Sequence, residues 1–406
     1  MQALAELDLP YLPVQSPEFG ADPTGHFARA RAQHPWLARS DIGYFVHEYR
    51  AIRELFWMDD KMRPSFDGIV EQLGAHGTPW GRFTEEQMIS LPPAQHKLLR
   101  DTFAARFTPR FANNLRPMMR ETITGLLDEW VSKGRFDFEE FASWFPISVM
   151  FRLVGAPVAR IGAIKKDLET LGLAFSMDKT RVPALQQSIT RLDQLVHELI
   201  ATRRARPAGD DPEDLLDLVI SAGDGGGISE RQLADLIMFF FIAGYDTSKN
   251  VLTFTMHLMM KNPTVYARCA EDHDYCRKAI EEALRYFNPG TTFRFTDQDI
   301  VFRDVLLPRD TMLFFPLSIS GRDPDAFPDA ETFDPERAID PNTRHLAFGL
   351  GKHMCLGQYI ARAQLQESLH LIAQRIKDPR LDGEYGWRPF PGTWGLKGLP
   401  IRFAAG

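Results

Sequence analysis

Cysteine is scarce in this sequence, and it contains neither a long apolar run nor an excess of positive charge. Only three cysteines occur among 406 residues, an odd number that argues against a disulfide framework. No run approaches the roughly 18 apolar residues of a membrane span, and the N-terminus shows no signal-peptide pattern. The net charge of −7 argues against a broad nucleic-acid-binding surface. We therefore expect a cytoplasmic protein that binds neither membranes nor nucleic acid.

Apolar residues recur at three- and four-residue spacing over much of the chain, which predicts a mainly helical fold. The segments with this spacing are 93–107, 115–132, 186–205, 229–260, 276–286 and 355–376. Ser229 and Gln232 form a capping box at the start of one of them. The strand-like signals are short and lie at 44–49, 299–308, 312–318 and 399–403. No segment reads as a flexible linker, so we expect residues 1–406 to form a single domain with small peripheral β-sheets.

One cysteine stands in an unusual setting, the stretch FGLGKHMCLG at 348–357. Helical periodicity resumes directly after Cys355, which places it at a helix N-terminus where the dipole and free amides favour a thiolate. Gly349, Gly351 and Gly357 permit sharp turns and the close approach of a large flat ligand. A lone thiolate suits a porphyrin, which supplies the other ligands of its iron. The alternative is a buried structural cysteine in a glycine-rich loop.

A second pattern lies in the apolar helix that ends in AGYDTSKN. Ala243 and Thr247 are four residues apart and share a face of the helix. Ala243 and Gly244 leave space beside the helix, and Asp246 and Thr247 place an acid and an alcohol next to that space. On its own, this pattern is more typical of a core helix with a polar exit.

Two further patterns bring charged residues to one helical face. The segment EEALR places Glu282 and Arg285 three residues apart, and PDAETFDPER follows it and supplies Arg337. The segment PPAQHKLLR places His96 and Arg100 four residues apart. Each pair alone is more typical of a solvated surface.

These motifs, in this order, resemble the cytochrome P450 superfamily, in particular its soluble bacterial members. The resemblance covers essentially the whole chain and implies a mainly α fold that encloses a buried haem b. It implies that Cys355 ligates the haem iron and that Asp246 and Thr247 deliver protons during oxygen activation. The remaining positions that match the haem-binding segments are Phe348, Gly349, Gly351, Gly357, Ala243 and Gly244, with His96, Arg100, Arg294 and His353 as partners of the haem propionates. In this family Glu282, Arg285 and Arg337 would be structural.

The resemblance implies a monooxygenase that inserts one oxygen atom from O2 into a C–H bond. The chain has no flavin or nicotinamide domain, so we expect NAD(P)H electrons to arrive through a separate ferredoxin and its reductase. The ferredoxin would dock on the Cys355 side of a monomer. A basic patch there would comprise Arg106, Arg110, Arg344, Lys352 and Arg362.

The substrate is specified only loosely by the sequence. Family topology places the candidate pocket residues in four segments; they are Trp80, Phe83, Met88, Phe175, Phe239, Ile242, Thr292, Phe293, Thr393 and Trp394. Such walls suit a small to medium hydrophobic molecule: a terpenoid, a steroid, a fatty acid or an aromatic compound. Arg82 is a candidate anchor for a substrate carboxylate.

Two other functions remain open from the residues. CAEDHDYC offers Cys269, His273 and Cys276 as ligands of a structural zinc ion, although a fourth ligand is not evident. A haem protein that uses peroxide, or only senses, is the other alternative. Peroxide-using members tend to lack the acid–alcohol pair, so the presence of Asp246 and Thr247 favours a monooxygenase.

Overall fold

The computed structural model describes residues 1–58, 60–64, 66–206, 214–338, 340 and 343–406. Helices make up most of it, as the apolar spacing predicts. They are α1 (Pro17–Ala21), α2 (Pro23–Gln33), α3 (Tyr49–Phe56), α4 (Asp67–Leu73), α5 (Pro79–Glu86), α6 (Pro93–Ala104), α7 (Pro109–Asn114), α8 (Arg116–Trp130), α9 (Phe138–Val154), α10 (Ile161–Leu171), α11 (Val182–Arg204), α12 (Leu215–Asp224), α13 (Glu230–Lys261), α14 (Pro263–Glu271), α15 (His273–Tyr286), α16 (Leu317–Ser320) and α17 (Gln358–Arg375).

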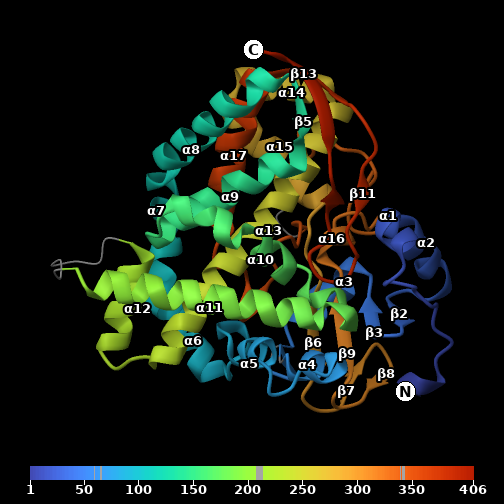
Figure 1. Ribbon diagram of the computed structural model, residues 1–406. Helices are drawn as coiled ribbons and strands as arrows, with labels where there is room; N and C mark the ends of the chain where they lie inside the picture. The colour runs from blue at the N-terminus through green and yellow to red at the C-terminus, as the bar shows by residue number, and fades with distance from the viewer. Residues whose placement is uncertain (59, 65, 207–213, 339, 341–342) are drawn as a thin grey trace.

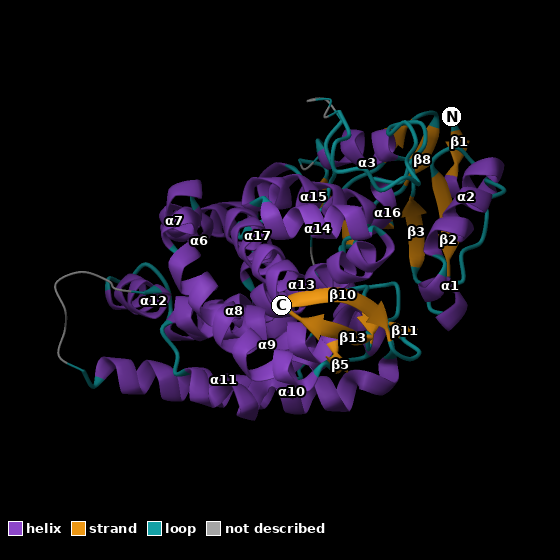
Figure 2. Ribbon diagram, turned by 90° about the horizontal axis from the view of Figure 1, so that it is seen from above, coloured by secondary structure: helices purple, strands orange, loops and turns teal. Residues whose placement is uncertain are grey.

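The strands form small sheets. One has the order β2 (Leu37–Ser40), β3 (Gly43–Val46), β9 (Met312–Phe315), β6 (Thr292–Thr296), β4 (Met62–Arg63). The others join β1 (Gln2–Ala3), β8 (Val305–Leu307) and β7 (Ile300–Phe302); β10 (Ile376–Leu381), β13 (Pro400–Ala405) and β5 (Arg135–Asp137); and β11 (Gly386–Trp387) with β12 (Leu396–Lys397). In Figure 2 the strands gather toward one side of the molecule and most helices lie on the other.

Three strand predictions need correction. Segment 299–308 is a hairpin, because Arg303 and Asp304 turn the chain at φ values of 47° and 65°. Segment 44–49 ends as a strand at Val46, and 312–318 passes from β9 into α16. Strand β6 was not predicted, although aromatic and polar residues alternate in its sequence TFRFT, a pattern typical of a strand.

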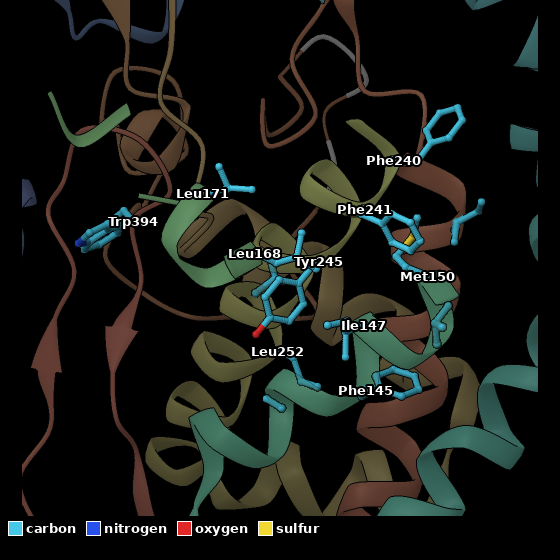
Figure 3. Packing of buried hydrophobic residues seen from close by; sticks show 14 of the residues in the cluster. Phe145, Ile147, Met150, Leu168, Leu171, Phe240, Phe241, Tyr245, Leu252 and Trp394 are labelled. Atoms are coloured by element: carbon cyan, nitrogen blue, oxygen red, sulfur yellow. The ribbon is translucent and has the colours of Figure 1, made fainter. Parts of the chain in front are cut away.

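Helix α13 runs through the middle of the helical part of the molecule (Figure 1). It begins at the predicted capping box, in which Ser229 and Gln232 each accept a hydrogen bond from the other's backbone amide. Its side chains Phe241 and Tyr245 pack in the hydrophobic core together with Met150 of α9 (Figure 3). A helix surrounded in this way has few places where a side chain remains accessible. Across the described residues, no helix is apolar enough over a sufficient length to cross a bilayer.

Candidate functional site

The loop that carries Cys355 lies between Leu346 and the start of α17. Gly349 and Gly351 both take φ of +68°, a left-handed conformation that glycine adopts without strain. The Cys355 amide donates a hydrogen bond to the Phe348 carbonyl at 2.8 Å, which closes the loop on itself. Gly357, with φ of −77°, is the N-cap of α17. The cysteine therefore precedes a long helix by only two residues, as the sequence predicts.

Cys355 combines an exposed surface with a perturbed pKa. Cys355 is exposed, whereas Cys269 and Cys276 are buried. Yet burial raises the pKa of its thiol, because protein atoms surround it on many sides. The two properties agree if the sulfur looks into an internal space rather than out of the protein. The Gly357 amide and the charges of Arg100 and Arg362 act in the opposite direction and favour the thiolate.

Helix α13 presents an accessible stripe although its surroundings are buried. Ala243 and Thr247 are exposed, while Tyr245, Asp246 and the residues from Ser248 to Met259 are buried. Ala243 and Thr247 lie one turn apart, and the Thr247 hydroxyl donates to the Ala243 carbonyl at 3.0 Å. The two exposed residues thus form a stripe on one face of a helix that is otherwise mostly buried.

Two contacts tie this part of α13 to the helices around the cysteine loop. Gln364 of α17 donates to Ser248, the neighbour of Thr247, at 2.6 Å. On α6, the ring of Phe103 packs edge-on against Phe240 of α13 with 5.7 Å between ring centroids. Helices α6 and α17 therefore both contact the part of α13 that carries Thr247 or precedes it.

The four predicted propionate partners lie together at the loop. The rings of His96 and His353 are 4.3 Å apart, and Arg100 donates to the Met354 carbonyl at 2.7 Å. Burial lowers the pKa of His353 to about 3, and the positive charges of Arg294, His96, Arg100 and Lys352 lower it further.

The histidine Nδ1 atom of His353 is buried and, within the described part of the chain, has no hydrogen-bond partner. Two nearby carboxylates would relieve both the orphaned nitrogen and the crowding of positive charge. The enclosed sulfur, the accessible stripe of α13 and this cationic cluster together fit a haem.

Asp246 lies away from the stripe that carries Thr247. It is 2% exposed, and its Oδ1 accepts from Arg388 at 2.7 Å and lies 3.4 Å from Lys249. Burial alone would raise the pKa of this carboxyl, but the charges of Arg388 and Lys249 outweigh it and hold the pKa below its ordinary value. Arg388 was missed by sequence reasoning because 142 residues separate it from Asp246. Lys249 had a local signal, its three-residue spacing.

Gly244 also needs correction. It does not leave space for a ligand: a Cβ atom there would lie 2.4 Å from the sulfur of Met150. A larger residue at position 244 would therefore require the Met150 side chain of α9 to move.

Glu282 and Arg285 are buried and form one cluster with the half-buried Arg337. Two guanidinium nitrogens of Arg285 reach the Glu282 carboxylate at 2.7 and 2.8 Å, and Arg337 lies 3.4 Å from it. The same arginines donate to backbone carbonyls of 321–332. This cluster fixes the segment that leads toward the cysteine loop.

The candidate pocket residues divide into two groups. Phe175, Phe239, Ile242, Thr292 and Thr393 remain partly accessible, while Trp80, Phe83, Met88 and Phe293 are buried. Trp394 instead belongs to the core: it is fully buried, stacks on Trp387 at 5.1 Å, and donates its indole N–H to the Gly20 carbonyl. The hydroxyl of Thr292 accepts from Arg294 at 3.3 Å.

Two other candidate roles change in the structure. Arg82 pairs with Asp235 of α13 through two hydrogen bonds of 2.8 and 2.9 Å, so it is not placed as a free anchor for a substrate. Arg362 is held by Glu281, and Arg106 lies over the ring of Phe111. Of the expected basic patch, Arg110, Arg344 and Lys352 are exposed.

The zinc alternative finds no support. Cys269 and Cys276 are buried, and the Cys276 thiol donates to the Cys269 carbonyl at 3.2 Å. The described ranges contain no group of three or more His, Cys, Asp or Glu side chains that could hold a metal ion.

Comparison with known proteins gives a consistent answer. A model of the cytochrome P450 family matches residues 174–377. Luteothin monooxygenase of Streptomyces thioluteus is 30% identical over 98% of this chain and 97% of its own length. Cytochrome P450 monooxygenase PikC of Streptomyces venezuelae is 29% identical, over 96% and 93%.

Solved structures share the fold. The complex of P450BioI with an acyl carrier protein that bears hexadec-9Z-enoic acid has a TM-score of 0.85 at 24% identity, covering 95% of this chain and all of that one. The myxobacterial CYP267B1, solved with myristic acid, has a TM-score of 0.86 at 25% identity, covering 96% and 98%. The fold class expected from the sequence is thereby confirmed.

Proposed function

This chain belongs to the cytochrome P450 family of haem oxidoreductases, and on that premise we propose that residues 1–406 act as one haem-thiolate monooxygenase domain in the cytoplasm. Its substrate is a small to medium hydrophobic molecule, into which it inserts one atom of O2. The observation that carries the proposal is the placement of Cys355, which is exposed although the protein around it raises the pKa of its thiol, in a glycine loop just before α17.

Bound haem would supply the activation of dioxygen through its iron. Cys355 would be the thiolate ligand, and the Gly357 amide and the positive charges of Arg100 and Arg362 stabilise its negative charge. His96, Arg100, Arg294 and His353 would hold the two propionates, since they form the cationic cluster beside the loop.

Proton delivery falls to Thr247 and Asp246. The Thr247 hydroxyl donates a hydrogen bond to the Ala243 carbonyl. Its oxygen therefore remains able to accept a hydrogen bond from water at the accessible stripe. Asp246 is ionised and held by Arg388 and Lys249. Because an ionised carboxylate carries no proton, it must leave Arg388 and take up a proton from water before it can pass one toward Thr247. The acid therefore acts by a change of rotamer rather than from its resting position.

Electrons come from NAD(P)H through a ferredoxin and its reductase. Ferredoxins are acidic, and Arg110, Arg344 and Lys352 are exposed cations, of which Lys352 lies in the cysteine loop itself. Reversing the charge of Arg344 and Lys352 should slow ferredoxin-driven turnover at low salt. Unchanged turnover at low salt would exclude this docking surface.

The substrate class follows from the apolar walls. Phe66, Phe175 and Phe293 form an aromatic group, with centroid distances of 4.7 to 6.0 Å, and Phe239 and Ile242 lie on the accessible side of α13. With Arg82 engaged by Asp235, we propose binding through shape and apolar contact rather than through a charged anchor. Myristic acid, bound by the related CYP267B1, is a sensible first compound beside terpenoids and steroids.

The test is the carbon monoxide difference spectrum of the dithionite-reduced protein, produced with a haem precursor. The wild type should show the strongly red-shifted Soret band of thiolate ligation, and Cys355→Ser should not. Absence of that band from the wild type would refute the proposal. Product formation with NADH, ferredoxin and reductase, but not with peroxide alone, would separate a monooxygenase from a peroxide-using enzyme.

A further inference from the structure

The carboxylate of Glu281 connects the two ends of the segment that carries Cys355. Glu281 lies on α15, directly before Glu282. Its carboxylate is 2.9 Å from Nε2 of His345, and it accepts from Nε of Arg362 at 2.6 Å and from a terminal nitrogen of Arg362 at 3.2 Å. In the chain, His345 precedes Cys355 and Arg362 follows it on α17. One side chain thus binds both sides of the loop.

The hydrogen bonds of His345 define its tautomer. The Ala347 amide donates to Nδ1 of His345 at 3.3 Å, so Nδ1 carries no proton. Nε2 must then carry the proton that it donates to the ionised Glu281. The hydrogen bonds of Arg362 and His345 hold the pKa of Glu281 at about 2, although burial acts to raise it. The glutamate is therefore a fixed negative charge under ordinary conditions.

Arg362 links this carboxylate to the environment of the sulfur. Its guanidinium lies 4.4 Å from the centre of the Phe348 ring, and the Phe348 carbonyl accepts the amide of Cys355. Arg362 is also one of the two cations whose charge favours the thiolate at Cys355. Whatever offsets the charge of Arg362 changes the electrostatic potential at the sulfur.

We propose that Glu281 is a positioning residue for the thiolate: it holds His345 and Arg362 against the loop, and its charge limits how strongly Arg362 stabilises the negative sulfur. This role rests on the proposed haem-thiolate function. It is separate from that of Glu282, whose carboxylate binds Arg285 and Arg337 and makes no recorded contact with the described part of the cysteine loop.

The test is the reduction potential of the haem-loaded protein, measured by spectroscopic titration for two variants. Glu281→Gln leaves the charge of Arg362 without its counter-charge, which withdraws electron density from the sulfur, so the potential should become more positive. Arg362→Gln removes that positive charge, so the potential should become more negative. A purely structural role would loosen the loop in both variants and would not produce shifts of opposite sign.

Glu336→Gln is the matched control. Glu336 also pairs with two cations, Arg268 and Lys278, but it is exposed and its partners lie outside the cysteine loop. The reduction potential of the haem-loaded Glu336→Gln protein should equal that of the wild type. Shifts of the same sign in the two test variants, or no shift in either, would overturn the proposal.

Two outcomes need separate treatment. If Glu281→Gln fails to retain haem, the Arg362→Gln protein decides: a lower potential supports the charge argument, and an unchanged one overturns it. If the wild type itself shows no thiolate band with carbon monoxide, the proposed function fails. That failure is distinguishable from a failure of the Glu281 proposal, because the wild-type spectrum alone reveals it.

Discussion

Replacing Arg388 with methionine tests the buried ion pair on α13. Asp246 and Arg388 are 2% and 8% exposed, and their charged atoms are 2.7 Å apart. Removing one partner of such a pair costs about 3–5 kcal/mol, because the other charge is left buried. Lys249 remains 3.4 Å from the same carboxylate oxygen and compensates in part, so we expect a loss near the lower end, about 3 kcal/mol. Denaturant unfolding of the haem-loaded protein measures it.

The double variant Arg388→Met, Asp246→Asn isolates the pair. With both charges removed, Lys249 still has Glu139 at 2.8 Å, so the double variant should be more stable than the sum of the single losses predicts. A loss below about 1 kcal/mol for Arg388→Met, or strict additivity, would refute the ion-pair argument.

The pH dependence of unfolding gives a further check on this pair. The folded pKa of Asp246 lies below its ordinary value of 3.8. Its contribution to stability is therefore fully present above that value and is lost as the pH falls below it. Arg388→Met should reduce the loss of unfolding free energy that occurs as the pH falls below this value.

Three further changes have definite expected outcomes. Thr247→Ala should leave the haem spectrum unchanged but divert several-fold more of the consumed NADH into peroxide, as product and peroxide assays would show; undiminished coupling would contradict a proton-handling role. Glu282→Gln should lower the free energy of unfolding by about 3–5 kcal/mol and reduce haem retention. The exposed Glu336→Gln should lower it by less than about 1 kcal/mol in the same assay, and equal losses would contradict burial as the cause. Gly349→Ala should cost about 1–3 kcal/mol from its positive φ alone, since a Cβ there meets nothing within 4 Å; a neutral effect on thermal unfolding would mean that the loop can relax.

Helices were predictable where apolar residues recur at three- and four-residue spacing. The segments 93–107, 115–132, 186–205, 229–260, 276–286 and 355–376 correspond to α6, α8, α11, α13, α15 and α17 within a few residues. Helix α9 was missed because nearly all its side chains are buried and Pro146 lies inside it. A helix without a polar face has no amphipathic period to detect.

The candidate site was predictable to the extent that its chemistry depends on local spacing. The turn at Cys355 needs glycine at the two positions with positive φ, and Ala243 and Thr247 must share a helical face. Such requirements leave a pattern in a few consecutive residues. They predicted that Cys355 lies in a loop just before a helix and that Ala243 and Thr247 share one helical face.

Residues that act through their charge carry no such local requirement, because electrostatic effects depend on distance in space. Arg388 reaches Asp246 from 142 residues away, and Glu281 reaches Arg362 from 81. Their positions in the sequence are set by the fold, so no sequence motif indicates them. The same division separates Asp246 from Thr247 in the resting structure: the 100° step between successive residues of α13 and the attraction of Arg388 turn the carboxylate into the core.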